Sequence, residues 1–223
     1  MLTAQFILIA TVGFLTGLAL AVIPITSLRR QLREALHQAH HDALTGLPNR
    51  RHLRTRMRQA VAAGEPIAVA VLDLDGFKGI NDRFGHGAGD DVIAEVARRL
   101  TATPGIRVAA RLGGDEFALL IDQTSTQQVQ DVVADAARRV LSKPVFLGRQ
   151  GWTSVPGLSV GITAADPQAT PQLLLHRADA AMYQAKTQQS GMAWHQPDTD
   201  DIADTVPERP SVRQRDRRTT TQP

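Results

Sequence analysis

Helical and strand patterns alternate between residues 41 and 195, and this alternation constrains the fold more than any other feature of the sequence. Apolar residues at helical spacing predict helices over residues 49–63, 87–100, 126–141 and 171–187. β-rich runs predict strands over residues 67–72, 107–111, 116–121, 158–163 and 192–195. The second and third of these strands flank Gly113 and Gly114, so we expect a hairpin with the glycines and Asp115 in its turn. The pattern predicts an α/β fold with a mixed central β-sheet flanked by helices.

Composition excludes some classes of protein. The 223-residue chain has no cysteine, which rules out disulfides and cysteine-based zinc sites. Arginine dominates the cations, since Lys78, Lys143 and Lys186 are the only lysines among 25 basic residues. A basic cluster at residues 29–58 follows an apolar segment directly, which favours lipid headgroups over nucleic acid as its contact. No nucleic-acid-binding signature accompanies this cluster or the basic residues at 209–218. We therefore expect no nucleic-acid partner.

The first 28 residues carry no charged side chain. Residues 6–25 are nearly all apolar, and a helix of that length spans about 30 Å, the thickness of a hydrocarbon core. Arg29, Arg30 and Arg33 follow at once, so the positive-inside rule places the remainder of the chain in the cytoplasm. We therefore predict a single-pass transmembrane helix at 1–28 in the inner (plasma) membrane. A cleaved signal peptide is the alternative, although the segment lacks a basic n-region and its apolar run is long for one.

Two further segments flank the α/β region. Residues 29–41 are predicted to form a helical linker, with Leu28, Leu32, Ala35, Leu36 and Ala39 at roughly helical spacing. This linker is either a short coiled coil between two chains or a plain amphipathic connector. Residues 196–223 are rich in Asp, Arg, Thr and Pro, and we expect a disordered tail.

Acidic residues follow the apolar strand at 67–72. Alternation along an extended strand would place Asp73 and Asp75 on one face. Unpaired charge at the end of a buried strand is costly, and a hard divalent cation would offset that cost. Mg²⁺ prefers carboxylate and phosphate oxygens, so the pattern predicts a magnesium site.

The predicted hairpin supplies a second pair of acids, Asp115 and Glu116. Gly113 and Gly114 remove side chains just before them, so that a bulky anion can approach the backbone. Carboxylates from two β-elements are how palm-type nucleotidyl transferases hold two metal ions. We therefore expect Mg²⁺ or Mn²⁺, two ions per half-site.

A polar run from Asn81 to Asp90 is the third candidate. The amide of Asn81 and the carboxylate of Asp90 can together read the hydrogen-bonding edge of guanine. Alternatively, both residues cap turns or helix starts, which is the commoner use of Asn and Asp.

The motifs together resemble the GGDEF family, the catalytic domain of diguanylate cyclases, whose fold is palm-type and similar to that of nucleotide cyclases. The resemblance covers about residues 41–195, and we predict that residues 42–195 form the catalytic domain. It rests on five ordered blocks. These are HDALTGLPNR at 41–50, DLDGFKGIND at 73–82 with GHGAGD at 85–90, RLGGDEF at 111–117, SVGI at 159–162, and ADAAMYQAK at 178–186.

The resemblance implies a role for each motif residue. Metal binding would fall to the carboxylates of Asp73, Asp115 and Glu116 and to the backbone carbonyl of Leu74. Asp115, Glu116 and Lys78 would be catalytic. The residues implied in substrate binding are Asn81, His86, Asp90, Gly113, Gly114 and Lys186. The two lysines would lie near the phosphates, where a compact ammonium acts as a point charge; alternatively, they are solvated surface lysines.

The implied activity is condensation of two GTP molecules into cyclic di-GMP with release of pyrophosphate. Each domain would hold one GTP, so the enzyme would act as a homodimer that aligns two nucleotides. The chain departs from the family pattern at two places. Pro104 and Arg107 replace the Arg and Asp of the family's product-inhibition site, and Gln189-Ser190 stands where relatives often have a phosphate-binding arginine. The alternative function is therefore a catalytically degenerate module that binds GTP or a protein partner.

Overall fold

The computed structural model describes residues 11, 13, 27–28, 30–32, 34–147, 151–153, 155, 157–166 and 168–195. The chain divides into two compact units, Met1–His41 and Asp42–Pro223. Most of the segment at 1–28, which we predict to be transmembrane, and all of the tail after residue 195 lie outside the described residues. Among the residues that are described, no helix is both long and apolar enough to span a bilayer.

The linker is helical at residues 34–40, as the apolar spacing predicts. Leu28, Leu32 and Leu36 expose 66, 58 and 52% of their surface within this unit. Because residues four apart lie on the same side of a helix, these leucines form one apolar stripe. Pairing of two such stripes as a coiled coil stays a prediction.

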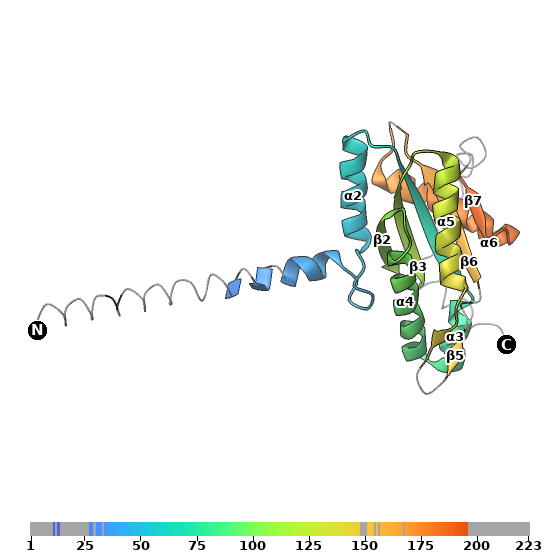
Figure 1. Cartoon of the computed structure of the whole chain (residues 1–223), viewed down its shortest axis with the longest axis horizontal. Helices are drawn as coiled ribbons and strands as arrows, with labels where there is room; N and C mark the ends of the chain where they lie inside the picture. Colours follow the sequence, from blue (N-terminus) through green and yellow to red (C-terminus); the bar gives the residue numbers. More distant parts are fainter. Residues whose placement is uncertain are drawn as a thin grey trace, which may run out of the picture. The chain divides into compact units, whose positions relative to one another are not determined.

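The second unit is built on a five-stranded mixed sheet with the order β2-β3-β1-β6-β7 (Figure 1). β1 is antiparallel to both of its neighbours, β3 and β6, and β7 runs parallel to β6. The strands are β1 (Ile67–Asp75), β2 (Ile106–Gly113), β3 (Glu116–Asp122), β6 (Gly157–Ala164) and β7 (Met192–Trp194). The predicted mixed α/β fold is confirmed.

Helices cover both faces of the sheet. One face packs on α4 (His86–Thr101) and α5 (Thr126–Leu141) through Ala68, Ala70 and Leu72 of β1. The other packs on α2 (Arg50–Ala62) and α6 (Pro171–Gln188) through alternate residues of the same strand, Ile67, Val69 and Val71. Because side chains alternate along a strand and β1 is buried on both faces, it reads as a continuous apolar run. β1 is therefore the central element from which the site residues extend.

Helix starts follow the sequence. Asn49, Ser125 and Thr170 cap α2, α5 and α6, each accepting a hydrogen bond from a backbone N–H three residues ahead. The alternative reading of Asn81 and Asp90 as helix caps is wrong. Both lie inside helices, Asn81 in α3 (Phe77–Phe84) and Asp90 in α4, whose N-cap residues are Gly76 and Gly85.

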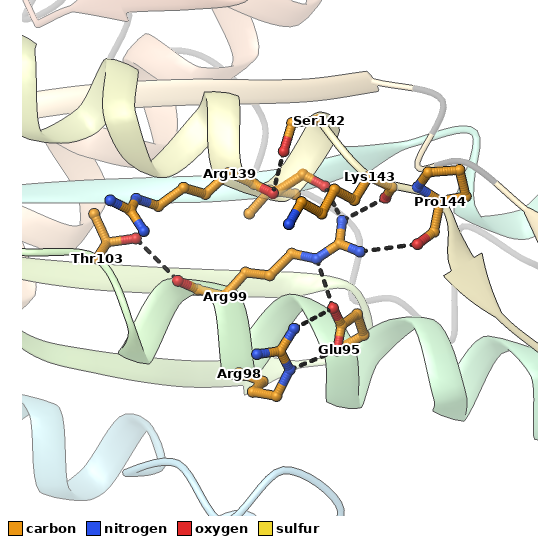
Figure 2. A network of polar contacts seen from close by, with 9 residues as sticks. Glu95, Arg98, Arg99, Thr103, Arg139, Ser142, Lys143 and Pro144 are labelled. Carbon is orange, nitrogen blue, oxygen red and sulfur yellow. Dashed lines mark hydrogen bonds and ion pairs between the residues drawn. The ribbon is translucent and has the colours of Figure 1, made fainter.

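The sequence analysis did not predict α3. It also did not predict a small two-stranded sheet formed by β4 (Val145–Phe146) and β5 (Trp152–Thr153). A polar network ties the start of this sheet to α4 (Figure 2). Arg99, only 6% exposed, donates to the carbonyl oxygens of Val140 at 2.6 Å, Lys143 at 2.7 Å and Pro144 at 3.1 Å. It also pairs with Glu95 at 2.8 Å, so one guanidinium fastens the end of α5 and the chain after it to α4.

Replacing Arg99 with Met should lower the free energy of unfolding by about 2 kcal/mol, since three carbonyl oxygens near the end of α5 lose their donor. Urea denaturation followed by circular dichroism measures the effect. Arg98→Met is the matched control, because Arg98 bonds the same Glu95 but its side chain is 69% exposed, and it should cost less than about 1 kcal/mol. Equal losses in the two variants would contradict the role given to the carbonyl contacts.

Candidate active site

β1 extends to Asp75, so Asp73 and Asp75 lie on the same face of the strand as predicted. This is the face that α6 covers. Asp73 is only 2% exposed, and Lys186 of α6 brings its Nζ to 2.5 Å from Asp73 Oδ1. Asp75 accepts a hydrogen bond from the Ser159 hydroxyl at 2.9 Å, and its Oδ1 lies 3.6 Å from Lys186 Nζ. A buried carboxylate and its partly exposed neighbour therefore share one ammonium group.

The hairpin between β2 and β3 brings the second pair of acids to the same place. Gly114 and Asp115 form its turn, and Gly113 and Gly114 have φ values of 141° and 55°, which favour glycine. In the register of β1 and β3, Glu116 lies directly opposite Asp73. The Leu74 N–H also donates to the Asp115 carbonyl oxygen at 3.4 Å, so the turn is joined to the end of β1.

Electrostatics show how closely the acids gather. Burial raises the pKa of Asp115, and the negative charges of Asp73 and Glu116 raise it further, while Lys186 opposes the shift. Negative charges that disfavour the ionisation of Asp115 make a favourable environment for a divalent cation. The donor set of Asp73, Asp115 and Glu116 is all oxygen and fits Mg²⁺ or Mn²⁺. Among the described residues, however, no three such groups are already arranged to hold a metal ion.

Gly161 explains how Lys186 reaches a strand end so distant in sequence. A Cβ on Gly161 of β6 would lie 2.0 Å from the Ala178 carbonyl oxygen and 2.1 Å from the Met182 nitrogen. The backbones of β6 and α6 therefore approach more closely than any side chain would allow. Lys186 follows Met182 by about one turn of α6, which carries its ammonium to Asp73.

Arg111 is hydrogen-bonded to the hairpin turn that carries Asp115. Its Nε and Nη2 donate to the Gly114 carbonyl oxygen at 3.0 and 2.8 Å, and its Nη1 lies 2.9 Å from Asp42 Oδ1. Burial raises the pKa of Asp42, but hydrogen bonds from Thr45 and Arg111 outweigh it and hold the pKa below its usual value. The opening motif thus supports the turn that carries Asp115. Sequence reasoning gave neither Arg111 nor Asp42 a role, although both stand in the motifs.

Arg111→Lys should lower kcat/KM by about 10- to 100-fold, because an ammonium cannot span Gly114 and Asp42 as the planar guanidinium does. Steady-state kinetics with the substrate of this site measures kcat/KM for both proteins. Arg98→Lys, an exposed exchange on α4, is the control and should leave the kinetics unchanged. The bracing role is contradicted if the two variants behave alike.

The residues predicted to bind guanine lie on two helices that pack together, α3 and α4. Asn81 of α3 packs against α4 beside Asp90, since a Cβ on Gly89 would lie 2.0 Å from Asn81 Oδ1. That oxygen is buried and has no hydrogen-bond partner among the described residues. A buried polar atom without a partner is costly, and a ligand donor would satisfy it. Asp90 is exposed and follows Gly89 directly on α4. An amide oxygen and a carboxylate are therefore both available to a ligand.

The remaining predicted site residues lie around these groups. Lys78 is exposed on α3, and His86 is exposed at the first position of α4. The Leu74 side chain is buried on the α4 face, and its carbonyl as a metal ligand stays a prediction. Two of the positions that depart from the family pattern are also described. Arg107 forms an ion pair with Glu65 and lies 3.0 Å from Asp122. Gln189 is the C-cap of α6 and has a left-handed conformation.

The mixed sheet thus presents carboxylates at the end of β1 and at the β2–β3 hairpin, and the Asn81 and Asp90 pair lies on α3 and α4. The comparisons identify the family. The family model described as "Diguanylate cyclase, GGDEF domain" matches residues 39–192, so the chain belongs to the GGDEF family.

The relatives include diguanylate cyclase TpbB of Pseudomonas aeruginosa, 42% identical over 163 residues, which are 70% of this chain and 37% of TpbB. Response regulator PleD of Caulobacter vibrioides is 36% identical over 166 residues, 71% of this chain and 36% of PleD. This chain therefore spans little more than a third of the length of these relatives. A solved structure of the coiled coil and GGDEF domain of DgcB from Caulobacter crescentus, in complex with c-di-GMP, matches with a TM-score of 0.71. It is 30% identical, and the match covers 80% of this chain and 97% of that one.

Proposed function

We propose that this chain is a diguanylate cyclase that condenses two GTP molecules into cyclic di-GMP and releases two pyrophosphates. The observation that carries the proposal is the convergence of Asp73, Asp115 and Glu116 at the junction of β1 with the β2–β3 hairpin. The similarity to TpbB, a diguanylate cyclase, supports it, as does the c-di-GMP complex of DgcB.

The chain's own residues account for binding and orientation. Asn81 and Asp90 would hydrogen-bond the guanine edge, with the unpartnered Asn81 oxygen accepting from the base. Gly113 and Gly114 leave the turn without side chains, so the triphosphate can approach its backbone. Lys186 and Lys78 would balance the phosphate charge.

Asp73, Asp115, Glu116 and the Leu74 carbonyl would hold Mg²⁺ or Mn²⁺, two ions per half-site. Such ions lower the pKa of an attacking hydroxyl and neutralise charge on the phosphate. Each 3′-hydroxyl would attack the α-phosphate held by the other domain, so that two new phosphodiester bonds form as two pyrophosphates leave. One half-site holds one reactant, and the active form is therefore a homodimer.

We also propose that the chain is anchored in the inner membrane by a single helix at residues 1–28, followed by a linker at 29–41 that pairs two catalytic domains. The uncharged apolar run and the arginines after it support the anchor. The exposed stripe of Leu28, Leu32 and Leu36 supports the pairing, since these side chains have an apolar face to bury.

Incubation of the purified chain with GTP and Mg²⁺ tests the function. We expect one cyclic di-GMP and two pyrophosphates for every two GTP consumed, with specific activity rising with protein concentration as dimers form. Comparing the activity of the whole chain with that of residues 41–223 tests whether residues 1–40 promote pairing of the catalytic domains. GTP binding with no product, even at high protein concentration, would instead support the second candidate, a catalytically degenerate module; the substitution at Gln189-Ser190 favours that alternative.

Added cyclic di-GMP should leave the initial rate of GTP turnover unchanged. The positions of the family's product-inhibition site hold Pro104, which is uncharged, and Arg107, which is bonded to Glu65 and Asp122. Initial rates measured over a range of added product test this. A progressive fall in rate would contradict the expectation.

A further inference from the structure

Lys186 lies against Asp73, one of the carboxylates proposed to hold the metal ion. Its Nζ is 2.5 Å from Asp73 Oδ1 and 3.6 Å from Asp75 Oδ1, between two carboxylates on the same face of β1. Asp73 is 2% exposed, so its oxygens cannot turn to water when a second cation approaches. The ammonium and a divalent cation would therefore compete for the same oxygen.

Asp73 and Asp75 differ in the partners that they would keep if Lys186 moved away. Asp75 is held by the Ser159 hydroxyl, which lies 2.9 and 3.1 Å from its two oxygens, so this carboxylate keeps a partner when Lys186 leaves. Asp73 instead faces Glu116 across the strand pair and lies near Asp115, with which it would share an ion. Release of Lys186 would thus free Asp73, one of the three carboxylates proposed to hold the metal.

The position of Lys186 would also let its side chain leave Asp73. It stands two residues before the end of α6 at Gln188, and its side chain is 40% exposed although Asp73 is buried. Its flexible stem can carry the charge away from Asp73 while α6 stays fixed against β6. A triphosphate bound beside the acids would offer it a new anionic partner.

We propose that Lys186 acts as a switch that occupies the metal site in the nucleotide-free protein and transfers to the triphosphate when metal and GTP bind together. This deepens the proposed function and rests on it for the identity of the nucleotide. Its consequence is cooperativity: metal alone must displace an ammonium, whereas metal with GTP gives that ammonium a better partner. Coupling of this kind is reciprocal, so metal should raise nucleotide affinity by the same factor.

Mn²⁺ titration of the whole chain without nucleotide, followed by the paramagnetic resonance signal of free Mn²⁺, tests the competition. Lys186→Met should bind Mn²⁺ at least about fivefold more tightly than the unaltered chain, at the low end of typical coupling factors. Lys143→Met removes the same charge from the segment before β4 and should leave the affinity unchanged. Lys186→Arg keeps a cation at the position and should retain weak binding, which guards against an effect of altered folding.

The same titration with α,β-methylene GTP tests the transfer. The nucleotide should tighten Mn²⁺ binding several-fold more in the unaltered chain than in Lys186→Met, because only the former has an ammonium to relocate. Equal or weaker Mn²⁺ binding by Lys186→Met without nucleotide would overturn the proposal. These affinities are measured without turnover, so the switch can fail while cyclic di-GMP is still made, and it can hold in a chain that makes none.

Discussion

Asp115→Asn should reduce cyclic di-GMP synthesis on the order of 10³-fold, while the folded protein becomes slightly more stable. The activity falls because an amide has the shape of the carboxylate but not the charge that would hold a cation against the phosphates. The stability follows from the pKa of Asp115, which burial and the charges of Asp73 and Glu116 raise.

The sign of the stability effect is fixed by proton binding. When the pKa of an acid is higher in the folded state, the folded protein binds more protons between the two pKa values, and its stability falls as pH rises through that interval. Above that interval the ionised Asp115 therefore destabilises the metal-free fold, and Asn removes that cost. We expect the metal-free melting temperature at pH 7 to rise by a few degrees.

Activity assays and thermal denaturation of the same preparations measure both effects. Asp131→Asn is the control, because Asp131 is an exposed acid on α5 bonded to Gln127, and it should change neither quantity. Mg²⁺ with GTP should raise the melting temperature of the unaltered protein more than that of the variant. Survival of cyclase activity in Asp115→Asn would show that the acid is not part of the catalytic machinery.

Gly161→Ala should destabilise the fold by about 3 kcal/mol or more, the upper range for overpacking. The new Cβ would meet the Ala178 carbonyl oxygen at 2.0 Å and the Met182 nitrogen at 2.1 Å, and both are backbone atoms that cannot turn aside. α6 would have to move off β6, which would also displace Lys186 from the site where it would balance the phosphate charge. Residual activity should therefore fall even where the variant remains folded.

Urea denaturation and GTP turnover measure these two effects. Gly79→Ala is the matched control, since the same methyl group on α3 meets no atom within 4 Å. Because Gly inside a helix is less favourable than Ala, the control should stabilise the protein by about 0.5–1 kcal/mol. A Gly161→Ala variant as stable as the control would mean that the approach of α6 to β6 is not tight.

The strands and the hairpin could be predicted from the sequence because they depend on local patterns. The run at 67–72 reads as a buried strand, and the Gly113-Gly114 pair reads as a turn, so the hairpin and strand end follow. α3 was missed because it is short, contains Gly79, Asn81 and Asp82, and is bounded by glycines, all poor signs of a helix. β4 and β5 are two residues each, too short for any alternation to be visible.

Long-range contacts in the site could not be predicted in the same way. The Lys186 to Asp73 bond joins residues 113 positions apart, and the Arg111 to Asp42 bond joins residues 69 apart. Sequence spacing does not set the distance between a helix and a sheet; packing does, and here Gly161 decides it. The family resemblance implies that Lys186 lies near the phosphates, which stays a prediction, but only the folded chain shows it bound to the acid that would hold the metal.

Anomalous diffraction from crystals grown with Mn²⁺ and α,β-methylene GTP tests the central claim most directly. The account predicts an anomalous peak at about 2.1 Å from carboxylate oxygens of Asp73 and of Asp115 or Glu116, the distance expected for a small divalent cation, and within reach of phosphate oxygens. A nucleotide bound with the metal elsewhere, and with Lys186 still on Asp73, would contradict it.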